Sequence, residues 1–353
     1  MAPPGLANSN QYNTQTNSGQ TISDQHENII PNITILDGGF ATQLSCHVNQ
    51  AIDGDILWSA RFLATDKEAV INAHLDFLRA GADVIITNTY QASVDGFMKH
   101  LQMTEEESYN LIVESVTLAK TAVEKFQQEF GTDKRPTIAG SVGPYGASLH
   151  DGSEYTGSYA ATTSTETMRK WHLPRIKALI EGGVDMLALE TIPCKAEAEM
   201  LLKLIKTDFP QIKAWLAFSV RQDGKSIAYG ENFQQTARQC YDLNKNQLVA
   251  IGINCVAPRL VESFISGINR GKESDPMPLI VYPNSGESYK VELGWIDRDK
   301  CEPVETYVQR WLDLGITWIG GCCRTYAVDV TRIHNEVQRW KRKQTEHKCS
   351  CSE

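Results

Sequence analysis

Short apolar runs and longer amphipathic segments alternate eight times along this chain. The short runs are apolar without strict alternation, which is typical of parallel strands that are covered on both faces. They span residues 33–39, 84–90, 137–143, 186–191, 214–220, 249–255, 279–284 and 318–322. The intervening segments place apolar residues three and four positions apart, as an amphipathic helix does. They span residues 66–80, 104–130, 165–180, 195–208, 232–244, 258–269, 304–314 and 327–340.

Eight strands that are each followed by a helix predict a (β/α)8 barrel of the TIM type. The main alternative is an open, doubly wound sheet, which usually carries a glycine-rich phosphate loop after its first strand. Here that position holds Asp37-Gly38-Gly39-Phe40, which does not match GxGxxG, and no Walker sequence occurs in the chain. We therefore expect a single α/β barrel.

Length and composition fit one such domain. The chain has 353 residues, of which 41% are hydrophobic and 22% are charged, and a barrel of this type needs roughly 250 residues. We expect residues 31–345 to form the barrel. Residues 1–30 read as a polar, disordered leader, and residues 346–353 read as a polar tail.

Charge and hydropathy exclude several classes of protein. The net charge is −9 and no basic cluster precedes the last helix, which argues against a nucleic-acid partner. No apolar run approaches the roughly 18 residues of a membrane span, and the N-terminus lacks the apolar core of a signal peptide. We therefore expect a cytoplasmic protein whose cysteines are free thiols or metal ligands rather than disulfides.

Polar residues stand at the carboxyl ends of the predicted strands, where barrel enzymes carry their chemistry. These ends should converge on one rim, although they are far apart in the sequence. They carry Asp37, Thr87-Asn88-Thr89-Tyr90, Glu190-Thr191, Asn254-Cys255, Tyr282-Pro283-Asn284 and Gly320-Gly321-Cys322-Cys323.

Three cysteines at these strand ends are the sharpest chemical signal in the chain. Cys322 and Cys323 are adjacent, and Gly320-Gly321 gives the backbone freedom to turn both thiols toward one metal. Cys255 joins them from another strand end. Three thiolates favour Zn²⁺, and three protein ligands leave one tetrahedral position open, as in catalytic zinc sites. The alternative is that all three are small buried hydrophobic residues, which their shared place at strand ends disfavours.

The charge of such a centre indicates its chemistry. A zinc ion with three thiolates is net negative, so it is a poor Lewis acid for activating water. It is well suited to binding a fourth thiolate and lowering the pKa of that thiol. The predicted reaction is therefore the alkylation of a substrate thiol. An electrophile with positive charge, such as a sulfonium, would be attracted to this centre.

Several motifs in the chain resemble those of the homocysteine S-methyltransferase family. The metal motifs are GINC at residues 252–255 and GGCCRT at residues 320–325. Other stretches are similar to the branch that uses S-methylmethionine or S-adenosylmethionine as methyl donor. They are DGGFATQL at 37–44, TYQAS at 89–93, GSVGPYGASLHDGSEYTGSY at 140–159, LETIP at 189–193 and VYPNSGE at 281–287. The resemblance runs from about residue 33 to residue 332.

The resemblance implies a barrel that transfers a methyl group from a sulfonium donor to the thiol of L-homocysteine, forming methionine. It implies that Cys255, Cys322 and Cys323 are catalytic residues that bind one Zn²⁺ per chain. Asp37 and Glu190 would hold the ammonium group of the amino acid. The alternatives are a helix N-cap for Asp37 and a structural hydrogen-bond acceptor for Glu190.

The resemblance implies further substrate contacts. Backbone N–H groups around Gly38 and Gly39 would contact the substrate carboxylate. Asn88, Tyr90 and Asn284 would shape the pocket, and they either orient the substrate or brace the loops.

Three other functions stay open at this stage. The betaine-using branch carries a tyrosine where this chain has Thr191, and a long C-terminal extension for assembly, so betaine is the less favoured donor. Selenocysteine is an alternative acceptor, and a zinc-binding barrel without catalysis is the least favoured reading. We expect a monomer or a small homo-oligomer.

Overall fold

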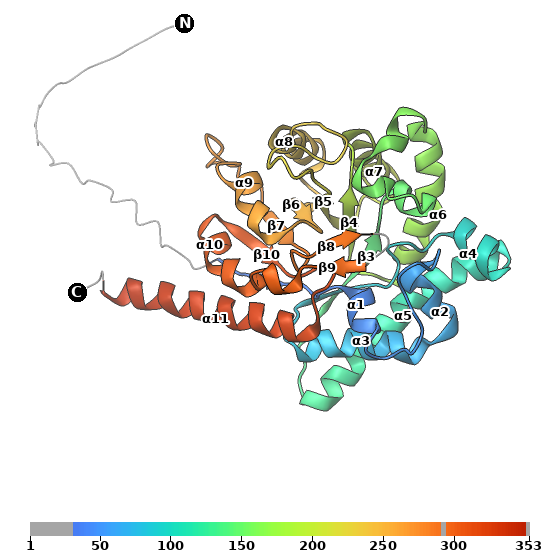
Figure 1. Cartoon of the computed structure of the whole chain (residues 1–353), viewed down its shortest axis with the longest axis horizontal. Helices are drawn as coiled ribbons and strands as arrows, with labels where there is room; N and C mark the ends of the chain where they lie inside the picture. The colour runs from blue at the N-terminus through green and yellow to red at the C-terminus, as the bar shows by residue number, and fades with distance from the viewer. Residues whose placement is uncertain (1–30, 291–293, 351–353) are drawn as a thin grey trace, which may run out of the picture. The chain divides into compact units, whose positions relative to one another are not determined.

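Eight parallel strands form a nearly closed barrel in the computed structural model, which describes residues 31–290 and 294–350 (Figure 1). The predicted leader and residues 351–353 of the predicted tail lie outside the described residues. The barrel strands are β1 (Thr34–Ile35), β2 (Val84–Ile86), β3 (Thr137–Val142), β4 (Met186–Ile192), β5 (Lys213–Phe218), β6 (Leu248–Asn254), β7 (Leu279–Tyr282) and β10 (Ile316–Ile319).

The order of the strands around the barrel is β1-β10-β7-β6-β5-β4-β3-β2, and all neighbours in this order are parallel. A parallel bridge between Leu36 and Val84 joins β1 to β2 and brings the ends of the sheet together. The predicted fold class, a (β/α)8 barrel, is confirmed.

A helix follows each barrel strand in the sequence and packs on the outside of the sheet (Figure 1). In the helix from Lys67 to Arg79, Val70, Phe77 and Leu78 are buried, and the Asp66 side chain caps the first turn by accepting from the Ala69 N–H. The helices are α3 (Lys67–Arg79), α5 (Glu105–Phe130), α6 (Thr165–Gly182), α7 (Lys195–Asp208), α8 (Phe233–Asn244), α9 (Val261–Ile265), α10 (Val308–Asp313) and α11 (Ala327–Ser350).

Shorter elements fill the loops at the ends of the strands. The α-helices among them are α1 (Phe40–Leu44), α2 (Phe62–Thr65) and α4 (Val94–Leu101), and β8 (Ser288–Lys290) pairs with β9 (Gly294–Ile296). The 3-10 helices are η1 (Trp58–Arg61), η2 (Tyr145–Leu149), η3 (Ser153–Tyr155), η4 (Ser158–Ala161), η5 (Pro258–Leu260), η6 (Arg298–Lys300) and η7 (Val304–Tyr307). Hydrophobic periodicity does not predict most of these elements because few span even two helical turns.

Two predicted helices and one predicted end differ from the structure. The segments predicted as helices over 258–269 and 304–314 each begin as a 3-10 helix, η5 or η7, before the short helices α9 and α10. The last helix, α11, continues to Ser350 instead of ending at residue 340, so the first residues of the predicted polar tail are helical.

The interior of the barrel is packed with side chains and lies beneath the site. Trp215 of β5 and Tyr282 of β7 are fully buried there, and the Trp215 indole N–H donates to the Tyr282 hydroxyl over 3.0 Å. Small residues on neighbouring strands, including Ala139, Ala188 and Ala250, make room for these two rings. The Trp215 and Tyr282 rings therefore separate the apolar core of the barrel from the polar residues at the strand ends.

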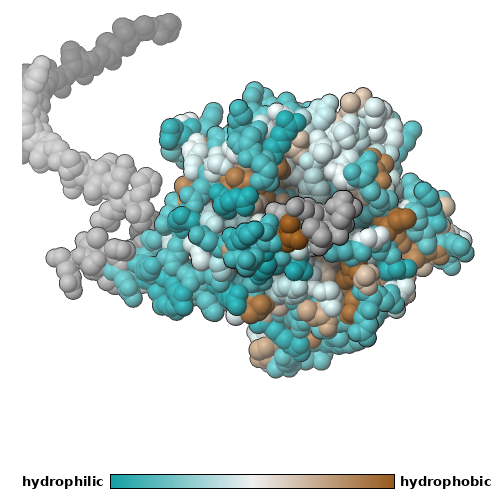
Figure 2. Space-filling model, viewed as in Figure 1, coloured by the Kyte–Doolittle hydropathy of each residue, from teal (hydrophilic) through white to brown (hydrophobic). Residues whose placement is uncertain are grey.

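The outer surface is mostly hydrophilic in the view of Figure 2, and its apolar patches are small and separated. Scattered apolar residues are normal on a globular surface. Within the described part of the chain, no helix combines the length and the apolar character that crossing a membrane requires.

Candidate metal centre and substrate pocket

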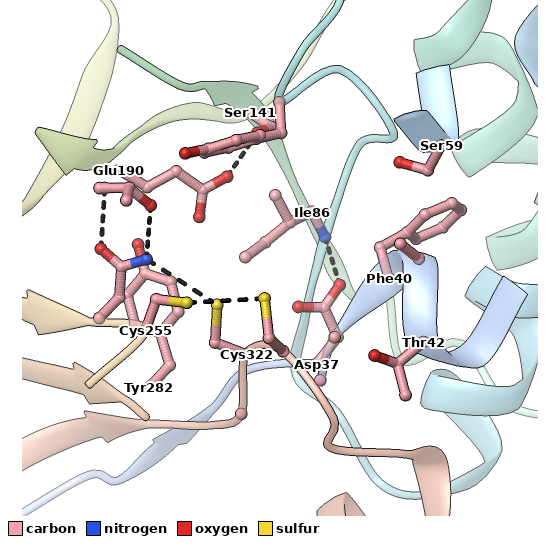
Figure 3. A pocket seen from close by; sticks show the side chains of 18 of the residues that line it. Asp37, Phe40, Thr42, Ser59, Ile86, Ser141, Glu190, Cys255, Tyr282 and Cys322 are labelled. Carbon is pink, nitrogen blue, oxygen red and sulfur yellow. Dashed lines mark hydrogen bonds between the residues drawn. The ribbon is translucent and has the colours of Figure 1, made fainter. Parts of the chain in front are cut away.

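A pocket opens at the carboxyl ends of the strands. Nearly every barrel strand contributes to the lining of this pocket through residues at its carboxyl end or directly after it, as the barrel topology requires. The lining residues that carry side-chain chemistry are Asp37, Asn88, Tyr90, Ser141, Tyr155, Glu190, Thr191, Asn254, Cys255, Tyr282, Cys322 and Cys323. Figure 3 shows most of this wall, with the sulfur atoms on one side and the two carboxylates facing the cavity.

The three predicted cysteines meet in this pocket. Their sulfur atoms all lie within 4.8 Å of one another, and the Sγ atoms of Cys255 and Cys323 are 3.5 Å apart. Cys255 has a positive φ of 50°, and its N–H donates to the Tyr282 carbonyl over 3.0 Å. Cys322 is held in a similar way, because its N–H donates to the Pro283 carbonyl over 2.7 Å. The backbone of β7 thus positions both sides of the cluster.

The glycines before the cysteine pair serve a different purpose from the predicted one. Neither Gly320 nor Gly321 is among the residues with positive φ. A Cβ on Gly320 would instead lie 2.5 Å from the Leu36 Cβ, and one on Gly321 would lie 2.1 Å from the Thr325 Oγ1. The strand end therefore needs glycine for close packing against Leu36 and Thr325 rather than for an unusual backbone turn.

The electrostatics of the cluster fit a bound cation. Hydrogen bonds from Cys322 and Cys323 lower the pKa of the Cys255 thiol. The pKa values of the other two thiols are raised, chiefly because each is hydrogen bonded to Cys255, and burial and the nearby charge of Cys255 add to the effect. The protein alone thus favours one thiolate, and a soft divalent cation is needed to ionise all three. Among the described residues no His, Asp or Glu joins the three cysteines, and three thiolates are a donor set that fits zinc.

Asp37 presents a carboxylate oxygen to the pocket. One oxygen, Oδ2, accepts from the Ile86 N–H over 2.7 Å, while the buried Oδ1 has no partner among the described residues. Burial raises the pKa of this carboxyl well above its usual value, and the nearby charge of Glu190 adds to the effect. Gly39, not Asp37, occupies the N-cap position of α1. The N-cap alternative for Asp37 is therefore wrong.

Glu190 faces the same cavity from β4. Its Oε1 accepts a hydrogen bond from the Ser141 hydroxyl, which links β4 to β3. Burial raises its pKa to about 7. Because Glu190 and Asp37 repel each other when both are ionised, a cation between them would stabilise both. The bond to Ser141 also fits the alternative prediction for Glu190, which is that it acts as a structural hydrogen-bond acceptor.

Asn88 and Tyr90 both line the pocket. The Asn88 side chain donates to the Ser59 carbonyl over 2.8 Å, which braces the neighbouring loop. Tyr90 packs edge-on against Trp58, and its buried hydroxyl lies beside Thr191 without a well-formed hydrogen bond among the described residues. Tyr90 is therefore placed to contact a ligand, whereas the amide of Asn88 is already engaged.

The two predicted glycines also line the pocket. The Gly39 N–H donates to the Thr325 carbonyl over 2.9 Å, so a substrate carboxylate would have to share that donor. A Cβ on Gly39 would lie 2.4 Å from the Cys322 carbonyl oxygen, and one on Gly38 would lie 2.8 Å from the Phe77 ring. Because a Cβ would clash with these atoms, packing alone is enough to require glycine at both positions.

Asn284 is not among the pocket-lining residues. Its amide donates to the Cys255 carbonyl over 3.3 Å and accepts from the Gly286 N–H over 2.8 Å. This placement supports a role in positioning Cys255 rather than direct contact with a substrate.

The sequence indicates no role for two groups of residues that support the site. Asn254 binds both the N–H and the hydroxyl of Thr191 over 2.8 Å and so holds Thr191 at a φ of 58°, which a β-branched residue rarely adopts. The loop after β3 brings the Tyr155 hydroxyl to 3.7 Å from the Cys255 Sγ. The position of Asn254 beside Cys255 was a usable signal, but nothing in the local pattern indicates how a long loop folds.

Buried Glu197 of α7 fixes that loop. It accepts from the Tyr145 N–H and from His172 over 2.7 Å each, and from the Tyr159 hydroxyl. Arg175 of α6 is also buried, and it donates to the backbone carbonyls that end β2 and β3. The wall around Tyr155 is therefore tied to the outer helices and not only to the barrel.

Comparison with known proteins agrees with this geometry. The family model for homocysteine S-methyltransferase matches residues 34–337. A betaine-homocysteine S-methyltransferase from Drosophila melanogaster is 47% identical over 314 residues, which are 86% of this chain and 94% of that protein. Homocysteine S-methyltransferase 1 from Brassica oleracea var. italica is 38% identical, over 86% of this chain and 93% of that one. The crystal structure of the metallated form of the homocysteine methyltransferase MmuM from Escherichia coli matches with a TM-score of 0.75 and 35% identity, over 86% of this chain and 96% of that one.

Proposed function

The chain belongs to the homocysteine S-methyltransferase family, and on this premise we propose that it methylates the thiol of L-homocysteine to form methionine. The methyl donor is a sulfonium, S-methylmethionine or S-adenosylmethionine. One Zn²⁺ per chain is held by Cys255, Cys322 and Cys323. A reducing compartment such as the cytoplasm keeps these thiols available for the metal.

One observation carries this proposal: three clustered thiols and two buried carboxylates face a single pocket. Homocysteine has a thiol at one end and an ammonium group at the other, so its two ends match these two groups of side chains. The free Oδ1 of Asp37 and the carboxylate of Glu190 are acceptors for the ammonium group.

Zinc at the three cysteines would leave one position for a substrate thiol and would lower the pKa of that thiol. The carboxylates fix the other end of homocysteine and thereby set where its sulfur lies. Tyr282 and Ser141 hold Glu190 in place. The new bond forms between this sulfur and the methyl carbon as the carbon–sulfur bond of the sulfonium breaks, and the donor leaves as a neutral thioether. Much of the rate enhancement would come from orienting the two substrates.

Two features bear on the choice of donor. Thr191 stands where the betaine-using branch carries a tyrosine, which favours a sulfonium. Betaine is a second candidate, because a relative that is 47% identical carries the name betaine-homocysteine S-methyltransferase. Selenocysteine is a second candidate acceptor, since its selenol would be held by the same groups. The buried carboxylates disfavour a zinc-binding barrel without catalysis, because zinc binding by the three cysteines does not require them.

The test is to supply the purified protein with homocysteine and each donor and to measure methionine by mass spectrometry. We expect methionine with a sulfonium donor and about one zinc per chain. Cys322→Ala should abolish both activity and stoichiometric zinc, whereas Cys46→Ser, which changes an exposed cysteine, should alter neither. Full activity of Cys322→Ala with its zinc retained would contradict the proposal.

A further inference from the structure

Side chains that can donate hydrogen bonds lie against two of the three clustered sulfur atoms. The Tyr155 hydroxyl is 3.7 Å from the Cys255 Sγ, and the Asn254 amide nitrogen is 4.0 Å from the Cys322 Sγ. The Asn254 amide also donates to the Thr191 hydroxyl, which already explains its position. The Tyr155 hydroxyl has no second partner among the described residues, so its approach to Cys255 needs an explanation of its own.

Tyr155 reaches from the mouth of the pocket to the cysteine cluster. The residue lines the pocket, yet 49% of its surface is exposed, so its ring lies at the open side of the cavity while its hydroxyl faces the sulfur. Its backbone is held in place. The Tyr155 N–H donates to the Gly152 carbonyl over 3.0 Å, and the carbonyl of the preceding residue, Glu154, accepts from the Ser219 hydroxyl over 2.8 Å. A fixed backbone gives the hydroxyl a defined position beside Cys255.

The function proposed above places a methylating agent in a pocket that also contains protein thiolates. A thiolate is the nucleophilic form of sulfur, and Cys255 lines the same cavity as the substrates would. A stray reaction would form a bond between the Cys255 sulfur and the methyl carbon as the bond from that carbon to the sulfonium sulfur breaks. The donor would leave as a neutral thioether, and Cys255 would become S-methylcysteine. The cluster would thereby lose one of its three anionic metal ligands.

A hydrogen bond to a thiolate lowers its reactivity, because the lone pair that accepts the bond is stabilised and must give up the bond in order to attack carbon. A phenol hydroxyl can donate such a bond. Resting on the function proposed above, we infer that Tyr155 protects Cys255 from methylation by the donor. Its hydroxyl donates to the Cys255 sulfur, so the sulfur of the substrate remains the more reactive nucleophile.

Two other cysteines provide internal references. The Cys323 sulfur is 3.5 Å from the Cys255 Sγ, and no hydroxyl or amide side chain of the described residues is hydrogen bonded to it. Cys46 is exposed and does not line the pocket. Loss of the Tyr155 hydroxyl should therefore change the reactivity of Cys255 and of neither reference.

The experiment measures the alkylation of each cysteine by methyl iodide, in zinc-loaded protein without homocysteine. Methyl iodide transfers its methyl group to sulfur and releases iodide, so it reports thiolate reactivity whichever natural donor the chain uses. Peptide mass spectrometry gives the rate at Cys255 relative to that at Cys46, in wild-type protein and in Tyr155→Phe. We expect the substitution to raise this ratio about tenfold or more, the size of one hydrogen bond to a charged group. The rate at Cys323 should change little.

Controls separate this role from a structural one. Tyr229→Phe, which removes the hydroxyl of an exposed tyrosine outside the pocket, should leave the ratio unchanged. Zinc should stay at about one per chain in all three proteins. An unchanged ratio in Tyr155→Phe would overturn the inference. A rise at all three clustered cysteines together with loss of zinc would also overturn it, because Tyr155 would then only support the fold.

A second arm uses S-methylmethionine in place of methyl iodide. Tyr155→Phe should accumulate S-methylcysteine at Cys255 faster than the wild type does, by a similar factor. If this variant forms methionine from homocysteine and Cys255 stays unmodified, the protective role is wrong. Absence of methionine with every sulfonium would instead contradict the proposed function, and not the effect of Tyr155 on Cys255, which methyl iodide measures by itself.

Discussion

The floor and the wall of the pocket are built in different ways. The floor, made of the residues that directly follow the barrel strands, is held by backbone bonds between neighbouring strands, such as that from the Cys255 N–H to the Tyr282 carbonyl. The wall, made of residues 143–161 after β3, is held largely by two buried side chains from outer helices, Glu197 of α7 and Arg175 of α6. Because the two parts have separate supports, a substitution in one support should leave the other part in place.

The largest effect should come from the carboxylates of the floor. Asp37→Asn and Glu190→Gln should each lower kcat/KM for homocysteine about 100-fold, because each removes a charged partner of the ammonium group. Zinc content should stay at the wild-type level, since neither residue is among the clustered thiols. Steady-state kinetics with metal analysis checks this. A loss that appears in the KM of the donor instead would mean that the floor does not select the acceptor.

Loosening the wall should produce the next largest effect. Glu197→Ala leaves three buried donors without their acceptor and should lower the free energy of unfolding by about 3 kcal/mol. If the variant stays folded at low temperature, the KM for the donor should rise while the Kd of homocysteine changes little. Chemical denaturation and calorimetry measure the two quantities. Equal weakening of both substrates would show that floor and wall are coupled.

The pH dependence of homocysteine binding should depend on Glu190. The pKa of Glu190, about 7, lies above the ordinary value of 4.5 because burial in the ligand-free protein disfavours the charged carboxylate. Its contribution to stability is present below pH 4.5 and is lost as the pH rises to about 7. Homocysteine needs the ionised form, so its Kd should fall as the pH rises from about 6 to about 8. Calorimetry should find a shallower dependence in Glu190→Gln, and an unchanged slope would remove Glu190 from the binding step.

The smallest effect is expected at Asn284. If it only positions Cys255, Asn284→Ala should raise the KM of homocysteine by less than about threefold, since the bond of 3.3 Å is long. Its zinc should be removed somewhat faster by a chelator. A tenfold or larger rise in this KM would restore the predicted direct contact with the substrate.

The sequence predicted the floor well because strand ends are defined by local pattern. Each apolar run marks a strand, and the barrel topology brings the residues after it together, so Asp37, Glu190 and Cys255 could be grouped in advance. Thr191 shows the limit of this reasoning. The apolar pattern places Thr191 at a strand end, but its positive φ depends on Asn254 of another strand.

The wall could not be predicted in the same way. Residues 143–161 have no periodicity, and their conformation depends on Glu197, which lies dozens of residues later in the sequence. Glu154 and Tyr155 therefore read only as part of a family-like motif. The sequence also predicts the wrong role for Gly320 and Gly321. Their role depends on close contacts with Leu36 and Thr325, which the local pattern does not reveal.

X-ray absorption at the zinc edge is the most direct test of the proposed metal site, since it reports the atoms around the metal in the protein with and without homocysteine. We expect three sulfur neighbours and one lighter atom in the substrate-free protein, and four sulfur neighbours once homocysteine is bound. A coordination sphere that keeps three sulfurs when homocysteine is bound would contradict the claim that thiols and carboxylates hold the two ends of one homocysteine.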